Sequence, residues 1–435
     1  MCIFDGKSLA PAALFVMRLF YNLAIALYGL VIRLCAPWSS KAKHFYRGRR
    51  DWYERYRDLL SAVKGRKRIW MHCASLGEFE QGRPVLEALK SQYPDTALVL
   101  TFFSPSGYEV RKDYKGADLV LYLPLDTPRN AERFVKLLQP ELALFVKYEF
   151  WYHYISVLYR HKIPVVYFSA IFQPRHIFFK WYGGFFRRML YRVSHFFVQN
   201  EESKDLLEKI GIGQVSIAGD TRFDRAIAVA GSPYRNEIIE RFTAGRKVLV
   251  AGSTWPGDET LLRKVLDLSE DYCLVIAPHE IDCSHIDAIL HSYSAYEPLC
   301  YNQMEVPSSV LPGSRVLIVD SFGMLAYLYR YADAVWIGGG FNPSGIHNTV
   351  EAAVYGKAVL FGPRYKRFRE AYDMLALGGA ASYGEGDAAA IAALLKDHKA
   401  LSAMGDSALE YVALQAGATE RIVSYIVLKY LSTSA

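Results

Sequence analysis

From residue 68 onward, the chain alternates short apolar runs with longer stretches in which apolar and polar residues are mixed. Runs such as ALVLTFF, LALFVKY and VVYFSAI in the first half, and KVLVAGS, CLVIAPH and AVLFGP in the second, are rich in Val, Ile, Leu and aromatic residues. This pattern is typical of parallel strands that are buried on both faces, with helices between them. We therefore predict an α/β fold with two consecutive doubly wound, Rossmann-like domains.

The strand pattern lapses between residues 221 and 242, where Gly231 to Pro233 interrupts the chain. The length of 435 residues also exceeds the ~250 to 300 residues at which a single hydrophobic core stops growing. We predict an N-terminal domain at residues 41–230 and a C-terminal domain, with the terminal helices, at residues 231–435. Two such domains are expected to face a cleft, and ligands are expected beyond the carboxyl ends of the strands.

The segment Ser8 to Ile32 carries one charged residue, Arg18, and has about the ~20 residues needed to cross a hydrocarbon layer. The segment Lys41 to Arg68, rich in Lys and Arg, follows it and favours a cytoplasmic position for the body of the protein. We predict that residues 1–40 form a single N-terminal membrane anchor. Two alternatives stay open. The helix lies flat, because Arg18 and Asn22 interrupt the apolar run, or the segment is a signal peptide, although it lacks a small-residue cleavage site.

Composition and motifs exclude several classes of protein. Hydrophobic residues make up 52% and charged residues 22% of the chain, with a net charge of +7, which indicates a globular chain and not a disordered one. The six cysteines show no CxxC pair and no zinc spacing, which suits reduced thiols in the cytoplasm. The string HEIDCSHID at residues 279–287 has no HExxH spacing, so we predict no metal site. The Walker and GxGxxG patterns are absent, which argues against an ATPase or a dehydrogenase.

The stretch AVWIGGGFNPSGIHNTVEAAVYGKAVLFGP, residues 334–363, predicts a strand, a glycine-rich turn, a helix and a second strand. Residues 338–340 and Gly345 are glycines, which let backbone amides approach a ligand, and the start of a helix favours an anion. We predict a nucleotide site here, with Glu351 accepting hydrogen bonds from ribose hydroxyls. In the alternative, Asn348 and Glu351 form a capping box that needs no ligand.

Two further strand-to-helix turns, AGSTWPGDE and DSFG, repeat this pattern. Four small residues of these turns are predicted to lie on the same rim as the glycine-rich loop, namely Ser253, Thr254, Ser321 and Gly323. Each of them is also explained as an ordinary helix cap, because Pro256 and Asp258 are typical of a first helical turn.

The string HCASLGEFEQG, residues 72–82, follows an apolar run and offers two interpretations of Glu78. Ser75 and Glu78 match the S-x-x-E capping box, in which the glutamate only stabilises the start of a helix. A glutamate beyond a strand and opposite a nucleotide site is equally suited to take a proton from an attacking hydroxyl. The residues alone leave both interpretations open.

Several motifs in the same order resemble one family, the 3-deoxy-D-manno-octulosonic acid (Kdo) transferases of lipopolysaccharide biosynthesis. They are WYERY, HCASLGEFEQ, YEFW, AGDTRFD, AGSTWPGDE, APH, DSFG and GIHNTVEAAVYGKAVLFGP. The resemblance implies a GT-B fold, a CMP-Kdo donor, a lipid A precursor as acceptor and inversion at the anomeric carbon. It also implies a place on the inner membrane with the catalytic domains on the cytoplasmic face, and no metal, cofactor or nucleic-acid partner.

Carried over by position, the resemblance makes Glu78 the catalytic base and makes Glu149 and Arg222 residues that support the transition state. The alternative for Arg222 is a simple pair with Asp220 or Asp224. The residues expected to bind CMP-Kdo are Ser253, Thr254, Pro278, His279, Phe322, Gly323, Met324, Gly345, Asn348, Thr349, Val350 and Glu351. The family often has Arg where His279 stands, Lys where Arg222 stands, and Glu-Thr-Glu-Leu-Trp at positions 147–151, so position 279 lacks the fixed charge of an arginine.

Because donor and acceptor are both anionic, basic residues are expected around the site. The candidates are Lys147, Arg175, Arg222, Arg364, Lys366 and Arg367. The stretch Pro174 to Arg192 interleaves aromatic and cationic residues and predicts either a surface for acyl chains and headgroups or a buried aromatic core. Two rival functions remain: a GT-B nucleotide-sugar epimerase, and a membrane-tethered sugar-nucleotide-binding protein without activity.

Overall fold

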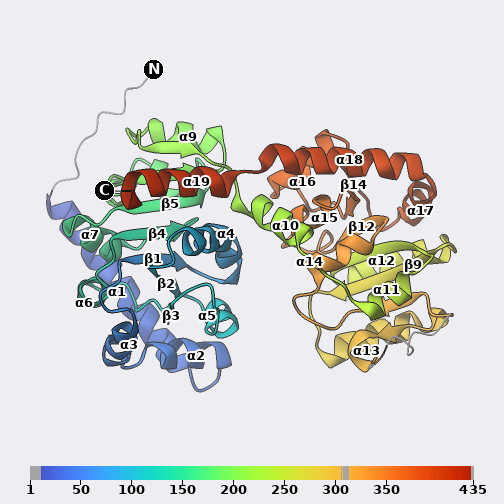
Figure 1. Ribbon diagram of the computed structural model, residues 1–435, viewed down its shortest axis with the longest axis horizontal. Coiled ribbons are helices and arrows are strands. Elements are labelled where there is room, and N and C mark those ends of the chain that lie inside the picture. The colour runs from blue at the N-terminus through green and yellow to red at the C-terminus, as the bar shows by residue number, and fades with distance from the viewer. Residues whose placement is uncertain (1–10, 305, 307–312, 433–435) are drawn as a thin grey trace. The chain divides into compact units, whose positions relative to one another are not determined.

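The computed structural model describes residues 11–304, 306 and 313–432 (Figure 1). The chain forms two compact units. Unit 1 contains the chain up to Arg225 and the segment from Gly417 onward, and unit 2 contains Ala226 to Ala416. The division falls inside a continuous helix, α10 (Thr221–Gly231), slightly before the predicted boundary between residues 230 and 231.

Within the described residues, the sheet of unit 1 has seven parallel strands in the order β3-β2-β1-β4-β5-β6-β7. The strands are β1 (Arg68–Cys73), β2 (Ala97–Phe102), β3 (Leu119–Tyr122), β4 (Leu142–Val146), β5 (Val165–Ala170), β6 (His195–Val198) and β7 (Val215–Ile217). Successive residues of β1 point to opposite faces. Met71 packs in one core cluster and Trp70 in the other, so both faces are buried, as the apolar runs predict.

Helices cover both faces of this sheet. They are α1 (Pro11–Cys35), α2 (Ser40–Arg49), α3 (Trp52–Leu60), α4 (Leu76–Gln92), α5 (Pro105–Arg111), α6 (Pro128–Leu138), α7 (Tyr152–Arg160), α8 (Gly184–Leu190), α9 (Glu201–Glu208) and α19 (Ala418–Ile426). Phe79 of α4 and Ile422 of α19 share one core cluster, whereas Phe134 of α6 and Tyr154 of α7 share the other.

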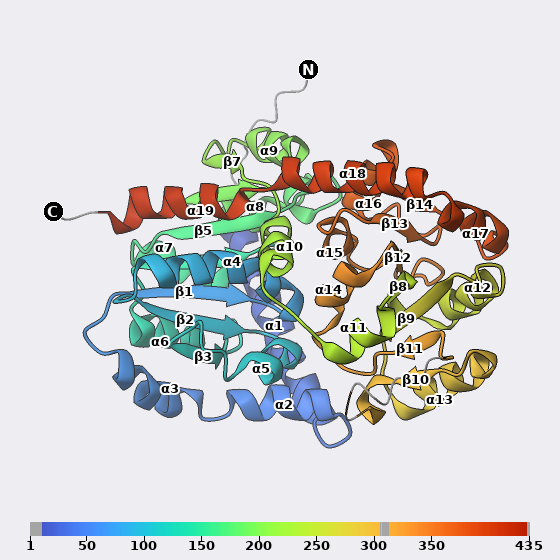
Figure 2. The same ribbon diagram turned by 45° about the vertical axis from the view of Figure 1, so that its right-hand side comes forward.

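The last helix, α19, packs in unit 1, whereas the sequence grouped it with the second domain (Figure 2). Ile422 and Ile426 are fully buried in the cluster that contains Phe79. Two N–H groups at the start of α19 donate hydrogen bonds to Asp224 at 2.7 and 2.5 Å. The apolar face of this helix therefore completes the cover of the first sheet.

The described part of unit 2 holds a second sheet of seven parallel strands, in the order β10-β11-β9-β8-β12-β13-β14. They are β8 (Lys247–Thr254), β9 (Tyr272–Pro278), β10 (Leu299–Cys300), β11 (Val316–Ile318), β12 (Ala334–Ile337), β13 (Ala358–Phe361) and β14 (Ala380–Ser382). The helices are α11 (Glu237–Thr243), α12 (Pro256–Asp267), α13 (Cys283–Ser292), α14 (Leu325–Leu328), α15 (Val350–Ala353), α16 (Arg369–Ala376), α17 (Ala388–Lys396) and α18 (His398–Gln415). Leu249, Ile276 and Trp336 of the sheet pack with Leu262 of α12 and Ile391 of α17.

Residues 1–10 of the predicted anchor, residues 1–40, lie outside the described residues, and α1 covers Pro11–Cys35 of the remainder. The part from Ala12 to Cys35 is long and apolar enough to cross a membrane, and it is the one helix of that kind among the described residues. Length and composition allow a spanning helix but do not require one.

Candidate functional site

The strand order of each sheet reverses at one point, between β1 and β4 in unit 1 and between β8 and β12 in unit 2. Ligands in open α/β sheets bind outside the carboxyl ends of the strands at such a point. Glu78 follows β1 and Glu149 follows β4, so both predicted catalytic carboxylates come from the strands at the reversal in unit 1. Thr254 ends β8 and Gly338 follows β12 at the reversal in unit 2.

Glu78 is partly buried in the first turn of α4. Ser75 stands at the N-cap position with an extended backbone (φ −141), but its side chain makes no capping hydrogen bond to the helix backbone. Its hydroxyl instead donates to the Glu78 carboxylate. Ser75 therefore orients Glu78. The Ser75 side chain does not form the capping hydrogen bond that the S-x-x-E motif predicts.

A buried thiol lies among three carboxylates at this edge of the sheet. Burial raises the pKa of Cys73 well above its usual value, and Glu78, Glu149 and Glu80 raise it further. Cys73 therefore stays protonated at neutral pH and is no nucleophile. Because Glu78 and Glu149 both raise the pKa of the Cys73 thiol, both carboxylates lie near the end of β1.

Glu149 is held by two residues to which the sequence gave no role. The indole N–H of Trp151 donates to Oε2 of Glu149 at 2.9 Å, and Nε2 of His72 lies 3.4 Å from the same oxygen. His72 is fully buried, and its Nδ1 lies 2.8 Å from the hydroxyl of Thr101. A histidine inside a buried parallel strand is a recognisable signal, because such a polar side chain needs hydrogen-bond partners.

Arg222 pairs with Asp220, one of the two partners considered from the sequence. Its Nε donates to Oδ2 of Asp220 at 2.8 Å, and its backbone N–H donates to Oδ1 at 2.9 Å. Gln81 of α4 donates to the same carboxylate at 3.0 Å. Asp224, the other partner considered, caps α19 instead. The Arg222 side chain is 30% exposed, so it is anchored near α4 without being enclosed.

Charges from several loops act on Tyr148, which lies between β4 and α7. Burial raises the pKa of its phenol; Arg175 and Arg222 oppose this rise, and Asp220 and Glu78 add to it. Electrostatic interactions between partly exposed groups are screened beyond about a Debye length. The four charged residues therefore lie close to Tyr148. The structure thus brings predicted cationic residues close to the predicted base within unit 1.

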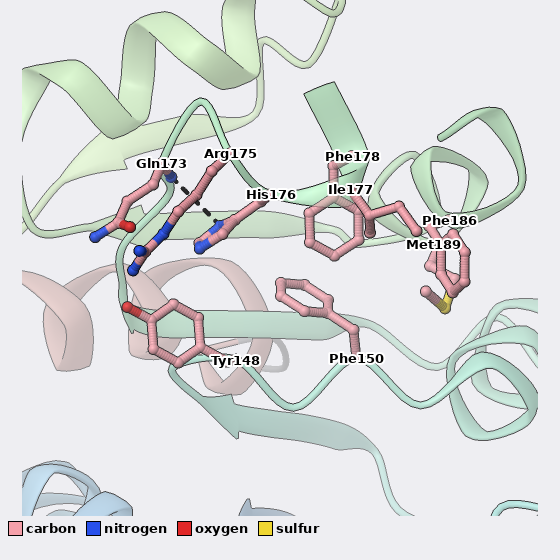
Figure 3. A pocket seen from close by; sticks show the side chains of 9 residues that line it. All are labelled: Tyr148, Phe150, Gln173, Arg175, His176, Ile177, Phe178, Phe186 and Met189. Atoms are coloured by element: carbon pink, nitrogen blue, oxygen red, sulfur yellow. Dashed lines mark hydrogen bonds between the residues drawn. The ribbon is translucent and has the colours of Figure 1, made fainter. Parts of the chain in front are cut away.

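Tyr148 also borders a pocket of about 450 Å³ in unit 1 (Figure 3). The other residues that line it are Phe150, Gln173, Arg175, His176, Ile177, Phe178, Phe186 and Met189. Tyr148, Arg175 and His176 gather at one end, and Phe186 and Met189 lie at the other. Burial, with Arg175, lowers the pKa of His176, so the positive charge at the polar end comes from Arg175.

The aromatic stretch at residues 174–192 is buried in part and exposed in part, and its binding of acyl chains stays a prediction. Phe178 and Phe185 are buried in unit 1, whereas Trp181 is 86% and Tyr182 52% exposed. The segment therefore contributes core on one side and an exposed aromatic surface on the other.

In unit 2, backbone packing explains two of the three consecutive glycines. A Cβ on Gly338 would lie 2.2 Å from the carbonyl oxygen of Ser253, and a Cβ on Gly340 would lie 2.5 Å from the backbone of Gly362. Both positions require glycine whether or not a ligand binds. The excess of glycine over what capping needs is therefore weaker evidence for a nucleotide than the sequence suggested.

Asp258 fixes the glycine-rich loop from the start of α12. Its Oδ2 accepts hydrogen bonds from the N–H groups of Gly339 at 2.9 Å and Trp255 at 3.0 Å. Its Oδ1 accepts from the indole N–H of Trp336 at 3.0 Å. Burial raises the pKa of Asp258, although these three donors favour its ionised form. The sequence described Asp258 only as a first-turn residue.

Three rings from three loops stack beside this loop. The His279 ring lies 4.9 Å from Trp255 and 4.4 Å from His347, nearly parallel to both. The indole N–H of Trp255 lies 3.1 Å from Nε2 of His347. Burial lowers the pKa of His347 to about 4, with His279 adding to the effect. His347 is therefore neutral at pH 7, and the stack offers a flat aromatic surface near the reversal in unit 2.

The remaining predicted binding residues of unit 2 differ in accessibility. Thr254 is buried and its hydroxyl donates to Glu259 at 2.9 Å. Thr349 is buried with a hydroxyl that has no hydrogen-bond partner among the described residues. Pro278 ends β9, and Phe322, 78% exposed, stands before Gly323 (φ +84) and Met324 in the loop that leads to α14.

The two ends of the predicted capping box are in contact. The Asn348 side-chain amide donates to Glu351 at 2.8 Å, and its oxygen accepts from the N–H of Val350 at 3.1 Å. The helix that follows, α15, is one turn long. These contacts stabilise the start of α15 without a ligand. Nucleotide binding at Gly345 and at residues 348–351 therefore stays a prediction.

Basic side chains border the same loop. Arg364, Lys366 and Arg367 are exposed after β13, and the backbone of Arg364 hydrogen-bonds to Gly340 and Ile346. Across the described residues, no group of three or more His, Cys, Asp or Glu side chains is arranged to hold a metal ion.

Solved structures share this two-sheet architecture. The UDP-GlcNAc 2-epimerase of Neisseria meningitidis, bound to UDP-GlcNAc, matches with a TM-score of 0.60 and 16% identity over 83% of this chain and all of that one (100%). The Acinetobacter baumannii protein MurG matches with a TM-score of 0.51 and 14% identity over 83% of this chain and 99% of that one. The fold is thus of the GT-B type, with two doubly wound Rossmann-like domains, as predicted.

Sequence relatives identify the family within that fold. Residues 50–225 match the family model described as 3-deoxy-D-manno-octulosonic-acid transferase (kdotransferase). The chain is 24% identical over 371 residues to the 3-deoxy-D-manno-octulosonic acid transferase of Haemophilus influenzae, covering 82% of this chain and 86% of that protein. It is 25% identical over 334 residues to the enzyme of the same name from Aquifex aeolicus, covering 74% and 83%. The chain thus carries a segment that matches the Kdo transferase family model and is similar to Kdo transferases over most of its length, which confirms the resemblance.

Proposed function

We propose that this protein is a glycosyltransferase that moves Kdo from CMP-Kdo to a hydroxyl of a lipid A precursor in lipopolysaccharide biosynthesis. The transfer inverts the anomeric carbon, uses Glu78 as general base and needs no metal. The observation that carries the proposal is the pair Glu78 and Glu149 at the strand-order reversal of unit 1, beside a pocket with one cationic and one apolar end.

The chemistry follows from where charge develops. The acceptor hydroxyl oxygen attacks the anomeric carbon of Kdo, its proton passes to the Glu78 carboxylate, and the bond from that carbon to the phosphate oxygen of CMP breaks. CMP leaves with additional negative charge on its phosphate. Arg222, and backbone amides of unit 2, would stabilise that charge, since preorganised donors act without solvent reorganisation. Glu149, oriented by His72 and Trp151, supports the developing positive charge on the sugar.

The pocket of unit 1 suits a lipid acceptor. Its aromatic and Met189 end has the character of an acyl-chain site, and Arg175 at the other end is matched to a phosphate or carboxylate of the acceptor headgroup. An acceptor bound in this way would bring its sugar hydroxyl toward the loops that carry Tyr148 and Glu78. Replacing Phe186 by Arg should therefore raise KM for the lipid while leaving CMP affinity unchanged.

In unit 2, the aromatic stack of Trp255, His279 and His347 and the glycine-rich loop are proposed to hold CMP-Kdo. A flat aromatic surface suits a cytosine base, and exposed Arg364 and Lys366 suit the phosphate and the Kdo carboxylate. The protein is proposed to act at the inner membrane with both units in the cytoplasm, where the basic segment after α1 favours them.

The deciding experiment is transfer from CMP-Kdo to a tetraacylated lipid A precursor by wild type and Glu78→Gln, with the product identified by mass. A Glu78→Gln protein that folds and binds CMP but transfers no sugar supports the base assignment. Glu87→Gln is the matched control, because Glu87 lies on the same helix and pairs with Arg83. Near-normal transfer by Glu78→Gln would refute the assignment and direct attention to Glu149 and Glu80.

The rival functions make different predictions in the same assay. A nucleotide-sugar epimerase, favoured by the fold of the solved neighbours, would act on its sugar nucleotide without lipid. Release of CMP that depends strictly on the lipid acceptor excludes it. A binding protein without activity would bind CMP-Kdo and form no product under any acceptor concentration.

A further inference from the structure

Helix α1 lies lengthwise against unit 1 (Figure 1). Its partly buried residues recur every three or four positions, which is one face of a helix. They are Ala13, Leu14, Met17, Tyr21, Asn22, Ile25, Gly29 and Ile32. Because this face extends along nearly the whole helix, α1 is docked along its side and not merely attached at one end.

Polar groups fix the middle of the docked face. The Tyr21 hydroxyl donates to Asp126 at 2.6 Å, and the Asn22 side-chain oxygen lies 2.6 Å from Nε2 of His153. Asp126 is buried and also accepts the N–H groups of His153 and Tyr154 at 3.0 Å each, so it caps the start of α7. Tyr21 and Asn22, which interrupt the apolar run of α1, therefore hydrogen-bond to the rest of unit 1.

A spanning position would break these contacts. Tyr21 and Asn22 stand near the centre of α1, so a helix that crossed the bilayer would carry them close to its midplane. Polar groups there have no water to bind, and each unsatisfied one is costly. Asp126 would lose one of its donors while remaining buried. Burial lowers the pKa of His153, and the exposed Arg18, one turn before Asn22, lowers it further, so Arg18 lies close to the residues that dock α1.

The opposite side of α1 is exposed and apolar. Its large residues are Phe15, Val16, Leu19, Phe20, Leu23, Leu27, Leu30, Val31 and Leu34, each more than a third exposed. Soluble proteins rarely leave a continuous apolar surface of this size uncovered. Two of the most exposed aromatic residues are Trp38, which follows α1 in the chain, and Trp181, at 86% each. Trp181 precedes α8, whose Phe185 ring lies 6.3 Å from that of Tyr21.

We infer that α1 lies in the plane of the membrane, with its exposed side inserted into one leaflet of an anionic phospholipid bilayer and its polar side bound to unit 1. The charge of the adjacent surface favours anionic lipid, because Lys41, Lys43 and Arg47 are exposed on α2 directly after the helix. Exposed tryptophans are typical of the lipid headgroup level. The inference does not depend on which sugar the protein transfers.

Labelling of the two ends of α1 tests the orientation. In full-length protein with Cys2, Cys35 and Cys283 replaced by Ser, a single cysteine is introduced as Lys7→Cys, before the helix in the sequence, or as Trp38→Cys, after it. A membrane-impermeant maleimide should label both positions in inverted inner-membrane vesicles and neither in intact spheroplasts. Labelling of the Lys7→Cys protein in spheroplasts would place that end across the membrane and overturn the inference.

Two substitutions separate lipid binding from docking. Leu23→Glu, on the exposed side, should reduce binding to phosphatidylglycerol-containing vesicles about tenfold or more without lowering Tm. Tyr21→Phe should leave vesicle binding unchanged and lower Tm by about 2–4 °C, since a hydrogen bond to a buried carboxylate is lost. Unchanged binding by Leu23→Glu overturns the inference, as does a wild-type dimer in solution that does not bind vesicles. Kdo transfer is not scored in either assay, so the result stands apart from the proposed function.

Discussion

Nε2 of the fully buried His72 lies 3.4 Å from Oε2 of Glu149, which joins the carboxyl ends of β1 and β4 at the point where the strand order of unit 1 reverses. His72 is itself held by Thr101 of the neighbouring strand, β2. Glu149 stands in a loop, so its carboxylate depends on His72 and Trp151 for a defined position. His72 is therefore a positioning residue for Glu149.

We expect His72→Phe to reduce the rate of Kdo transfer by about tenfold or more, because a hydrogen bond to a charged group contributes ~1.5–3 kcal/mol and each 1.36 kcal/mol changes a rate tenfold. CMP affinity should not change, because the residues proposed to bind CMP are in unit 2. His72→Gln retains an N–H donor and should recover part of the rate. Equal rates for His72→Phe and wild type would show that Glu149 needs no such support.

Asp258 offers a second test, now in unit 2. Asp258→Asn leaves one oxygen to accept from Gly339, Trp255 and Trp336, so at least one buried donor loses its partner, at a cost of about 1–3 kcal/mol in unfolding free energy. The glycine-rich loop should loosen, and CMP affinity should fall. Calorimetric titration with CMP and thermal denaturation measure the two effects. Lower stability with unchanged CMP affinity would mean that the loop does not touch the nucleotide.

Much of this architecture could be predicted from the apolar runs alone. The central strands are long and buried on both faces, so their signal in the sequence is strong. The sequence missed β10 and β14, which have only two and three residues and lie at the edges of the second sheet. It also grouped α19 with the second domain, because an amphipathic helix does not reveal which sheet it covers.

The candidate site was predicted unevenly for physical reasons. Motifs identified Glu78, Glu149 and Arg222, but their supporting residues are revealed only by the fold. His72, which contacts Glu149, and Gly339 and Trp336, which donate to Asp258, lie on other strands and loops, far away in sequence. The glycine-rich loop gave a stronger signal for a nucleotide than the structure supports, because backbone packing explains Gly338 and Gly340.

Histidines buried in the neutral form make stability depend on pH. Burial lowers the pKa of His347 to about 4, below the ~6.5 of an unfolded chain. Between these two values the unfolded state binds a proton that the folded state does not. The resulting loss of stability is absent above about pH 6.5 and grows as the pH falls toward 4.

We therefore expect the free energy of unfolding, measured by denaturant titration, to fall from pH 7.5 to pH 5. In His347→Gln this fall should be smaller by on the order of 1 kcal/mol, an estimate reduced because the ring is partly exposed. His153 and His195 have their pKa lowered to about 4 in the same way, so the variant should reduce the pH dependence and not abolish it. An identical pH dependence in wild type and variant would show that His347 does not remain neutral in the fold.

Substitution of Arg222 distinguishes two roles for this residue: a structural ion pair with Asp220, or stabilisation of the transition state. Its Nε is bound to Asp220 at 2.8 Å, a contact that fixes the guanidinium while leaving the side chain partly accessible. If Arg222 stabilises the charge that grows on the departing CMP, Arg222→Ala should lower kcat far more than it weakens CMP binding, since only the transition state carries that charge. Arg222→Lys keeps the charge but not the fork, and should retain an intermediate rate.

Asp220→Asn is the matched control for that experiment, because it removes the negative partner and leaves Arg222 in place. A loss of rate in Asp220→Asn as large as that in Arg222→Ala, with a lowered Tm in both, would assign the pair to the connection between α10 and Gln81 of α4. Equal losses in CMP affinity and kcat for Arg222→Ala would instead make Arg222 a simple binding residue. A kcat loss confined to Arg222→Ala, with CMP affinity and Tm retained, is the outcome that a role in the transition state requires.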